Sequence, residues 1–269
     1  MVNSMNMSKK SILITGNRGW IGNYLQQYLQ NRGYKVLGVD RERDIVTHLN
    51  YKVDLVIHLA AEVGRLNGEE HPRAMLETNI LGTLNVLDGC RYWGSKLINF
   101  STSEVSFPLT NVYGISKDCA EKLVEHYATN YNLQACTVRP MMLYGVGQVA
   151  SDYKSALDRF VWGSLHNQEY EVHRGAIRSW LHIKDFVKAI EKIVDNNDFN
   201  KYEVYDIGSD DYRTMEEIAE IVGGEYKVIN PPKFLTVVKK ADYSKIKDLG
   251  WQAKIKLEDG LKELLDWHT

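Results

Sequence analysis

Hydrophobic residues recur in two alternating patterns along the first half of the chain. Short apolar runs, the first at residues 11–15, are typical of buried strands, and between them apolar residues follow helical spacing. The expected strands are 11–15, 35–39, 54–59, 96–101 and 135–139, and the expected helices are 19–32, 75–90 and 113–131. Strands that alternate with helices predict βαβ crossovers and a parallel sheet.

The second half has a looser pattern. We expect helices at 155–165, within 182–196, at 215–222 and at 257–268, with a strand at 202–207. Residues 1–10 lack an apolar segment and are expected to be a flexible leader. The division is therefore 11–144 for the first domain and 145–269 for a smaller lobe, with segments that cross back.

Composition narrows the classes of function. The chain has 269 residues, 44% of them hydrophobic, and a net charge of -2 without a long basic run, so neither nucleic acid nor membrane is an expected partner. Cys90, Cys119 and Cys136 show no metal-ligand spacing, and no HExxH motif occurs. We expect reduced cysteines, a cytoplasmic protein and no metal site.

A glycine-rich loop follows the first strand and opens the first helix. It reads Gly16-Asn17-Arg18-Gly19-Trp20-Ile21-Gly22, with glycines spaced GxxGxxG. Glycines let the backbone approach a pyrophosphate, and the helix N-terminus offers free N–H groups. This context predicts a Rossmann-type α/β fold: a doubly wound parallel sheet that binds a dinucleotide, with a smaller C-terminal α/β lobe for the substrate.

The second expected strand ends at Asp40. A carboxylate there can accept hydrogen bonds from the adenosine ribose and repels a 2′-phosphate, which favours NAD over NADP. Arg41 follows directly and could tolerate the phosphate, so both cofactors stay open on the residues alone.

Tyr113 and Lys117 form a YxxxK motif on the third expected helix. Residues four apart share one helix face, and a neighbouring ammonium should lower the pKa of the phenol. Such a tyrosine can take the proton of a sugar hydroxyl while hydride leaves for nicotinamide.

The two motifs together resemble the short-chain dehydrogenase/reductase family. Further stretches resemble its extended branch, which acts on nucleotide sugars: His58-Leu59-Ala60-Ala61-Glu62, Glu77-Thr78-Asn79, Arg139-Pro140, Arg178-Ser179-Trp180 and Leu249-Gly250-Trp251. The resemblance implies bound NAD, transient oxidation at C4 of a nucleotide sugar, and a homodimer formed by helices 75–90 and 113–131.

The resemblance also implies roles for single residues. Thr102 would bind the reacting C4 oxygen, Tyr113 would be the base, and Lys117 would bind the nicotinamide ribose. The remaining cofactor contacts would come from the glycine loop (Gly16, Arg18, Gly19, Trp20, Ile21, Gly22) and from Asp40, Arg41, Asp44, Ile45, Leu59, Ala60, Ala61, Asn79 and Pro140. Substrate contacts would come from Glu62, Met142 and Arg178, the last to the diphosphate.

Ser101-Thr102-Ser103-Glu104-Val105 bears on the reaction. It resembles the sequence of sugar-nucleotide 4,6-dehydratases and of UDP-glucuronate decarboxylases. A ketone at C4 makes the C5 hydrogen acidic, and Glu104 is placed to remove it, with Ser103 where many dehydratases have aspartate. The alternative is that Glu104 only contacts sugar hydroxyls, as a polar residue does in 4-epimerases.

Some features depart from the family pattern. Nine residues separate Ser103 from Tyr113, where relatives have a longer segment, and Met142 replaces a typical asparagine. Thirteen residues, 41–53, follow the second strand, so the adenine side is trimmed, as in 4-keto-sugar reductases. A 4,6-dehydratase is the leading hypothesis; a 4-epimerase, a 4-keto-sugar reductase and a non-catalytic NAD-binding scaffold stay open.

Overall fold

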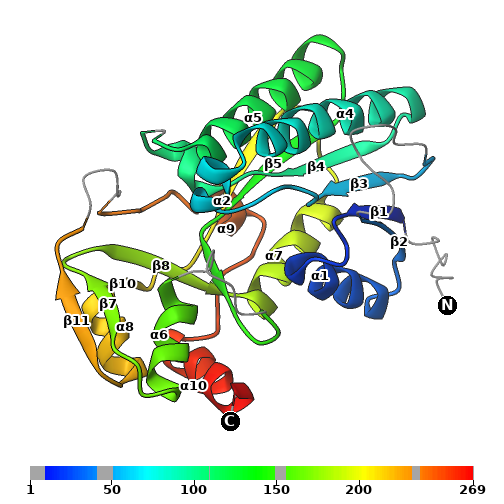
Figure 1. The fold of residues 1–269 in the computed structure, drawn as a ribbon. Coiled ribbons are helices and arrows are strands. Elements are labelled where there is room, and N and C mark those ends of the chain that lie inside the picture. The colour runs from blue at the N-terminus through cyan, green and yellow to red at the C-terminus, as the bar shows by residue number, and fades with distance from the viewer. Residues whose placement is uncertain (1–9, 41–50, 109, 149–155, 232–236, 269) are drawn as a thin grey trace, which may run out of the picture.

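The structure is a computed structural model that describes residues 10–40, 51–108, 110–148, 156–231 and 237–268. A six-stranded parallel sheet forms its larger part (Figure 1). The strand order is β2-β1-β3-β4-β5-β9, with β1 at Ser11–Thr15, β2 at Lys35–Val39, β3 at Leu55–His58, β4 at Lys96–Phe100, β5 at Ala135–Pro140 and β9 at Glu203–Ile207. The Rossmann-type fold predicted from the sequence is confirmed.

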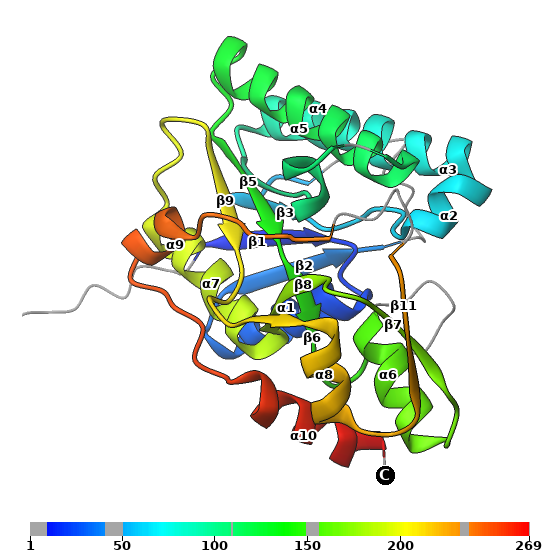
Figure 2. The same ribbon diagram turned by 90° about the vertical axis from the view of Figure 1, so that its left-hand side faces the viewer.

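Helices cover both faces of this sheet (Figures 1 and 2). One face carries α1 (Trp20–Asn31) and α7 (Ile183–Asn196), and the other carries α4 (Gly82–Trp93) and α5 (Val112–Asn130). Alternation along β1 explains both layers, because Ile12 and Ile14 pack toward α1 and α7 while Leu13 packs toward α4 and α5.

The expected helix 75–90 is divided into three parts. α3 (Pro72–Leu76) leads into a π-helical turn, η1 (Glu77–Leu81), which passes into α4. A π-turn inserts a residue into the helix and redirects the side chains around it. In this turn the buried Asn79 faces the loop after β3.

The smaller lobe has its own core between two short sheets and three helices (Figure 2). One sheet has the order β10-β8-β6 and the other pairs β11 with β7. Its elements are β6 (Met142–Tyr144), α6 (Ala156–Leu165), β7 (Tyr170–His173), β8 (Ile177–His182), β10 (Tyr212–Thr214), α8 (Met215–Val222), β11 (Tyr226–Ile229) and α10 (Leu257–His268). Short α9 (Ser244–Asp248) packs beside β9.

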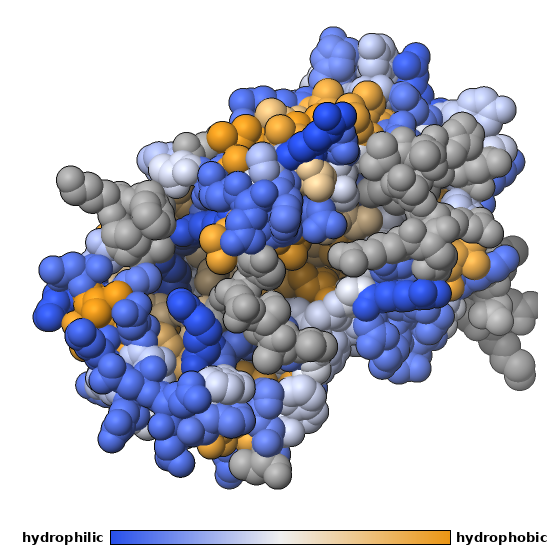
Figure 3. Space-filling model, in the orientation of Figure 1, coloured by the Kyte–Doolittle hydropathy of each residue, from blue (hydrophilic) through white to orange (hydrophobic). Residues whose placement is uncertain are grey.

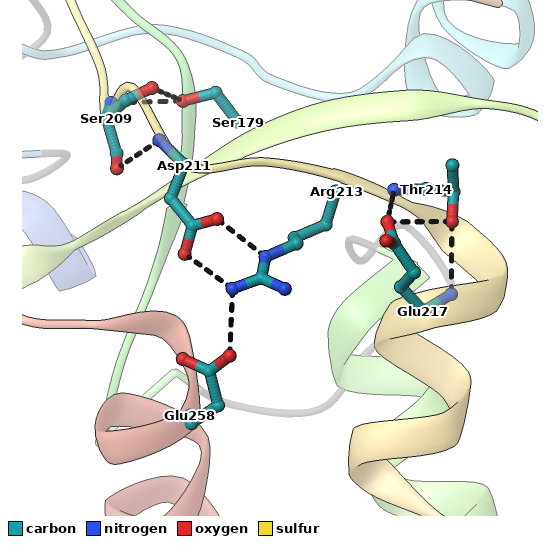
Figure 4. Close-up of polar contacts among 7 residues, drawn as sticks. All are labelled: Ser179, Ser209, Asp211, Arg213, Thr214, Glu217 and Glu258. Carbon is teal, nitrogen blue, oxygen red and sulfur yellow. Dashed lines mark hydrogen bonds and ion pairs between the residues drawn. The ribbon is translucent and has the colours of Figure 1, made fainter.

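Polar contacts hold this lobe together where its strands are short (Figure 4). Arg213 on β10 donates to Asp211 at 2.6 Å and to Glu258 of α10 at 2.9 Å. Thr214 and Glu217 form a capping box that begins α8. These contacts fix β10 beside β8, the strand that carries Arg178.

Candidate active site

The loops that follow the sheet strands meet at the carboxyl edge of the sheet. Because all six strands are parallel, the glycine loop after β1, Leu59 after β3, Thr102 after β4 and Pro140 at the end of β5 share this edge. Strand order reverses between β1 and β3, which is where ligands bind in doubly wound sheets. Figure 3 shows the surface hollowed between the sheet and the smaller lobe.

The glycine loop is a cradle that side chains would fill. Gly16 has φ +74, and a Cβ there would lie 2.7 Å from the Ala60 nitrogen. A Cβ on Gly22 would lie 2.2 Å from the Gly16 oxygen. Gly19 caps α1 without a side-chain hydrogen bond, so the first turn of the helix faces the hollow with backbone N–H groups.

Other residues expected to contact the cofactor border this loop. The Asp40 carboxylate accepts a hydrogen bond from the Arg18 nitrogen at 2.9 Å, which joins the end of β2 to the loop. The Trp20 indole donates to the carbonyl of Val146 at 2.9 Å, and Ile21 packs on the core of the sheet domain. Arg41, Asp44 and Ile45 lie outside the described residues. A cradle of glycines, an uncapped helix start and a carboxylate at the end of β2 fit a dinucleotide.

A buried network positions the loop after β3. Asn79 is 1% exposed, and its amide donates to the Glu62 carbonyl at 2.9 Å and to the Ser116 hydroxyl at 2.9 Å. The Glu62 nitrogen donates back to Asn79 at 2.8 Å. Asn79 therefore fixes residues 59–62 against α5, the helix that carries Tyr113 and Lys117.

His58 lies below the same loop and acts as a neutral structural residue. Its ring nitrogens pair with the hydroxyls of Thr15 at 2.7 Å and Thr83 at 3.1 Å. Burial, together with the charge of Lys117, lowers the pKa of His58 to about 3. The histidine is therefore uncharged at neutral pH and links β1, β3 and α4.

Tyr113, Thr102 and Lys117 come together as the sequence predicts. Asn111 caps α5 through its side chain, so Tyr113 lies in the first turn, where its hydroxyl lies beside Thr102. Lys117 is 6% exposed and lies near His58 and Glu121.

Burial, rather than the charge of Lys117, dominates the pKa of Tyr113 in this structure. Burial raises the pKa of Tyr113 to about 12, with Glu104 adding to the rise and the Thr102 hydrogen bond opposing it. Burial also lowers the pKa of Lys117 to about 8, against the opposite effect of Glu121. Desolvation is the largest cause of the pKa shift in both groups.

Glu104 lies in a cluster of cations that the motifs do not reveal. Arg65, on α2 (Arg65–Glu70), donates to both Glu104 carboxylate oxygens, at 2.8 and 2.7 Å. Lys239 forms a second ion pair with Glu104. Burial alone would raise the pKa of Glu104, but Lys239 and Arg65 hold it below its usual value.

The other residues of the Ser101–Val105 stretch support this position. Thr102 begins a 3₁₀ turn, η2 (Ser103–Ser106), and its hydroxyl accepts from the Glu104 nitrogen at 3.3 Å. Ser103 is 4% exposed. The short turn carries Glu104 away from the sheet edge, toward α2 and the smaller lobe.

The three residues expected to bind substrate lie on different elements of the two lobes. Arg178 of β8 is 6% exposed and donates only through Nη1, to the carbonyls of Ile177 and Val237 at 2.8 Å each, so its other nitrogens have no protein partner among the described residues. Met142 of β6 pairs with Trp180 of β8. Glu62 precedes α2 and accepts from the Asn67 amide at 3.2 Å.

The described part of the chain has neither a helix that could span a membrane nor a cluster of metal-binding side chains. Within the described ranges, no helix combines the length and the apolar character that crossing a bilayer requires. Nor do any three or more His, Cys, Asp and Glu side chains of this part of the chain gather as a metal site.

Comparison with known proteins places this arrangement in a family. The chain is 25% identical to a trifunctional UDP-glucose 4,6-dehydratase/UDP-4-keto-6-deoxy-D-glucose 3,5-epimerase/UDP-4-keto-L-rhamnose-reductase of Arabidopsis thaliana, over 97% of this chain and 47% of that protein. It thus spans about half the length of this relative. It is 26% identical to the UDP-N-acetyl-alpha-D-glucosaminuronate decarboxylase of Bacillus cytotoxicus, over 96% of this chain and 98% of the relative.

A solved structure shows the same fold. The UDP-glucuronic acid 4-epimerase of Bacillus cereus, in complex with UDP-glucuronic acid and NAD, superposes with a TM-score of 0.86 at 22% identity, over 96% of this chain and 98% of that one. The profile of the NAD dependent epimerase/dehydratase family matches residues 12–208, which is most of the chain. The protein therefore belongs to the NAD-dependent epimerase/dehydratase family.

Proposed function

We propose that this chain uses NAD to oxidise C4 of a nucleotide-diphosphate hexose and then eliminates water across C5 and C6, as a 4,6-dehydratase does. The observation that carries the proposal is Glu104, ion-paired with Arg65 and Lys239, close to Thr102 and Tyr113. Thr102 and Tyr113 support oxidation at C4, and the Glu104 carboxylate supports removal of the C5 proton.

Tyr113 and Thr102 serve the oxidation. The Thr102 hydroxyl, beside the phenol, orients the C4 hydroxyl, and Tyr113 takes its proton. NAD, when bound, would supply the acceptor for the C4 hydride, and its positive charge would favour the phenolate form of Tyr113. Lys117, buried one turn along α5, would hold the nicotinamide ribose.

Glu104 serves the elimination. A ketone at C4 acidifies the C5 hydrogen, and a carboxylate within reach can accept it. The cations around Glu104 keep it deprotonated at neutral pH, which a base requires. The same cations lower its basicity, so the carboxylate needs help from an acid at C6.

Arg178 anchors the substrate. Its side chain has unused donors and is buried in the hollow, which suits a bidentate contact with a diphosphate oxygen pair. Glu62, in the loop before α2, and Met142, on β6, would contact the sugar.

A 4-keto-sugar reductase is a second candidate. It is favoured by the position of β2 at the edge of the described sheet and by the short stretch of sequence, residues 40–54, between β2 and β3. A reductase consumes added reduced cofactor in proportion to product, whereas the proposed dehydratase regenerates it.

The experiment is mass spectrometry of the products formed from NAD and a panel of UDP-, dTDP-, GDP- and CDP-hexoses and UDP-uronates. We expect a product lighter by one water from a hexose. Tyr113→Phe should lower this turnover by about 100-fold or more while it still binds NAD. A product of unchanged mass would indicate an epimerase, and loss of carbon dioxide from a uronate would indicate a decarboxylase.

A further inference from the structure

Lys239 reaches Glu104 from the smaller lobe. Its backbone nitrogen donates to the Ile177 carbonyl at 3.3 Å, and the preceding residue pairs with β8. The side chain is 2% exposed, ion-paired with Glu104 and 5.7 Å from the Phe107 ring centroid. Lys239 is therefore buried beside Glu104, the carboxylate that we propose removes the C5 proton.

The surroundings of Lys239 make its ammonium a proton donor near neutral pH. Burial lowers the pKa of Lys239 to about 8, against the opposite effect of Glu104, while Arg65 and Arg178 lower it further. These three groups face it from η2, α2 and β8. Because the cluster carries three cations and one carboxylate, releasing a proton relieves charge repulsion.

The neighbouring groups are poorer acids. Arg65 and Arg178 are guanidinium groups that keep their protons in proteins. Burial holds the pKa of Tyr113 near 12, and Ser103, where many dehydratases have aspartate, offers only a neutral hydroxyl. Of the described side chains that we place around Glu104, Lys239 is the one suited to protonate a leaving group.

We propose that Lys239 is the catalytic acid of the elimination and gives a proton from Nζ to the C6 hydroxyl of the 4-keto sugar. This role rests on the proposed dehydratase function. The C5–H bond breaks and Glu104 takes the proton; the bonding pair forms the C5–C6 double bond, and the C6–O bond breaks. The C6 hydroxyl takes the proton of Lys239 and leaves as water. Lys239 then takes a proton from solvent. Solvent regains one proton when Tyr113 releases the proton that it took from the C4 hydroxyl.

Two variants of the full chain test this role, with the panel sugar that the wild type dehydrates. Lys239→Met removes the ammonium, and Lys239→Arg keeps the charge beside Glu104 but holds its proton too tightly. We expect both to release water about 100-fold more slowly or worse. Both should still reduce bound cofactor, seen by absorbance, and should still take up deuterium from D₂O at C5 of the recovered sugar.

Lys240→Met is the matched control, since Lys240 is exposed and lies over the Tyr212 ring rather than near Glu104. It should dehydrate as the wild type does, and all variants should unfold at similar temperatures. Wild-type water release should fall as the pH rises through about 8, because the acid must be protonated.

Three results would overturn the assignment while leaving the dehydratase function in place. These are water release at the wild-type rate in Lys239→Met, full recovery of water release in Lys239→Arg, and parallel loss of C5 exchange, which would show that Lys239 only positions Glu104. Absence of water release from the wild type with every sugar would instead overturn the dehydratase function, and the role of Lys239 with it.

Discussion

Glu104 is the residue on which the distinction between elimination and simple oxidation depends. Its side chain is 16% exposed and accepts hydrogen bonds from Arg65 and Lys239. A carboxylate with two cationic partners is ionised at neutral pH, since these cations hold its pKa below the usual value. The same cations make Glu104 a weaker base, and a proton donor at C6 compensates for this.

Replacement of Glu104 by glutamine should separate the two half-reactions. The amide keeps the shape but cannot accept the C5 proton, so deuterium uptake at C5 and water release should fall by about 100-fold or more. Reduction of bound cofactor should persist, because Thr102 and Tyr113 are unchanged.

Glu77→Gln is the control for this substitution. Glu77 pairs with the exposed Arg73 on the surface, and its loss should leave both readouts unchanged. Water release by Glu104→Gln at the wild-type rate would leave Glu104 as a sugar contact, as in the epimerase alternative.

The site residues that lie in short motifs were the easiest to predict from the sequence. Thr102, Tyr113 and Lys117 come together because the end of a strand and the start of the following helix meet at one sheet edge. Arg65 and Lys239 were missed, since they pair with Glu104 across 39 and 135 positions and belong to no motif. The raised pKa of Tyr113 is not predictable from the sequence, because spacing shows a nearby lysine but not the burial that dominates.

The first turn of α1 is the element that the cofactor site needs most. Its approach to the loops after β1 and β3 depends on the absence of side chains at Gly16 and Gly22. The alternating pattern of strands and helices was readable because parallel strands covered on both faces are apolar runs. The π-turn at Glu77–Leu81 could not be predicted from the sequence, since one inserted residue barely alters the helical spacing of apolar residues.

Gly22→Ala should weaken NAD binding. The new methyl group would meet main-chain atoms of Gly16 and Asn17, at 2.2 and 2.8 Å, which cannot rotate away. We expect at least a 10-fold rise in the Kd for NAD, measured by fluorescence titration, and a loss of about 1–3 kcal/mol in the free energy of unfolding.

Gly94→Ala is the matched control at the far end of α4. Gly94 has φ +68 with open space around it, so alanine there should cost about 1 kcal/mol of stability and leave NAD affinity unchanged. Equal NAD affinity in Gly22→Ala and the wild type would show that the cofactor does not use this cradle.

At the scale of the molecule, the Glu104 cluster joins the two lobes. Arg65 and Glu104 belong to the sheet domain, whereas Lys239 and Arg178 belong to the smaller lobe. A sugar bound between the lobes would meet groups from both at once. The homodimer expected through the α4 and α5 faces stays a prediction, which light scattering of the purified chain tests.

The measurement that tests the central claim most directly follows a deuterium label. The chain is incubated with NAD and panel hexoses that carry deuterium at C4, and the product is analysed by mass spectrometry and NMR. We predict a product lighter by one water with the deuterium at C6, because the hydride removed from C4 returns there after the elimination. A product of unchanged mass, with the deuterium still at C4, would contradict this account.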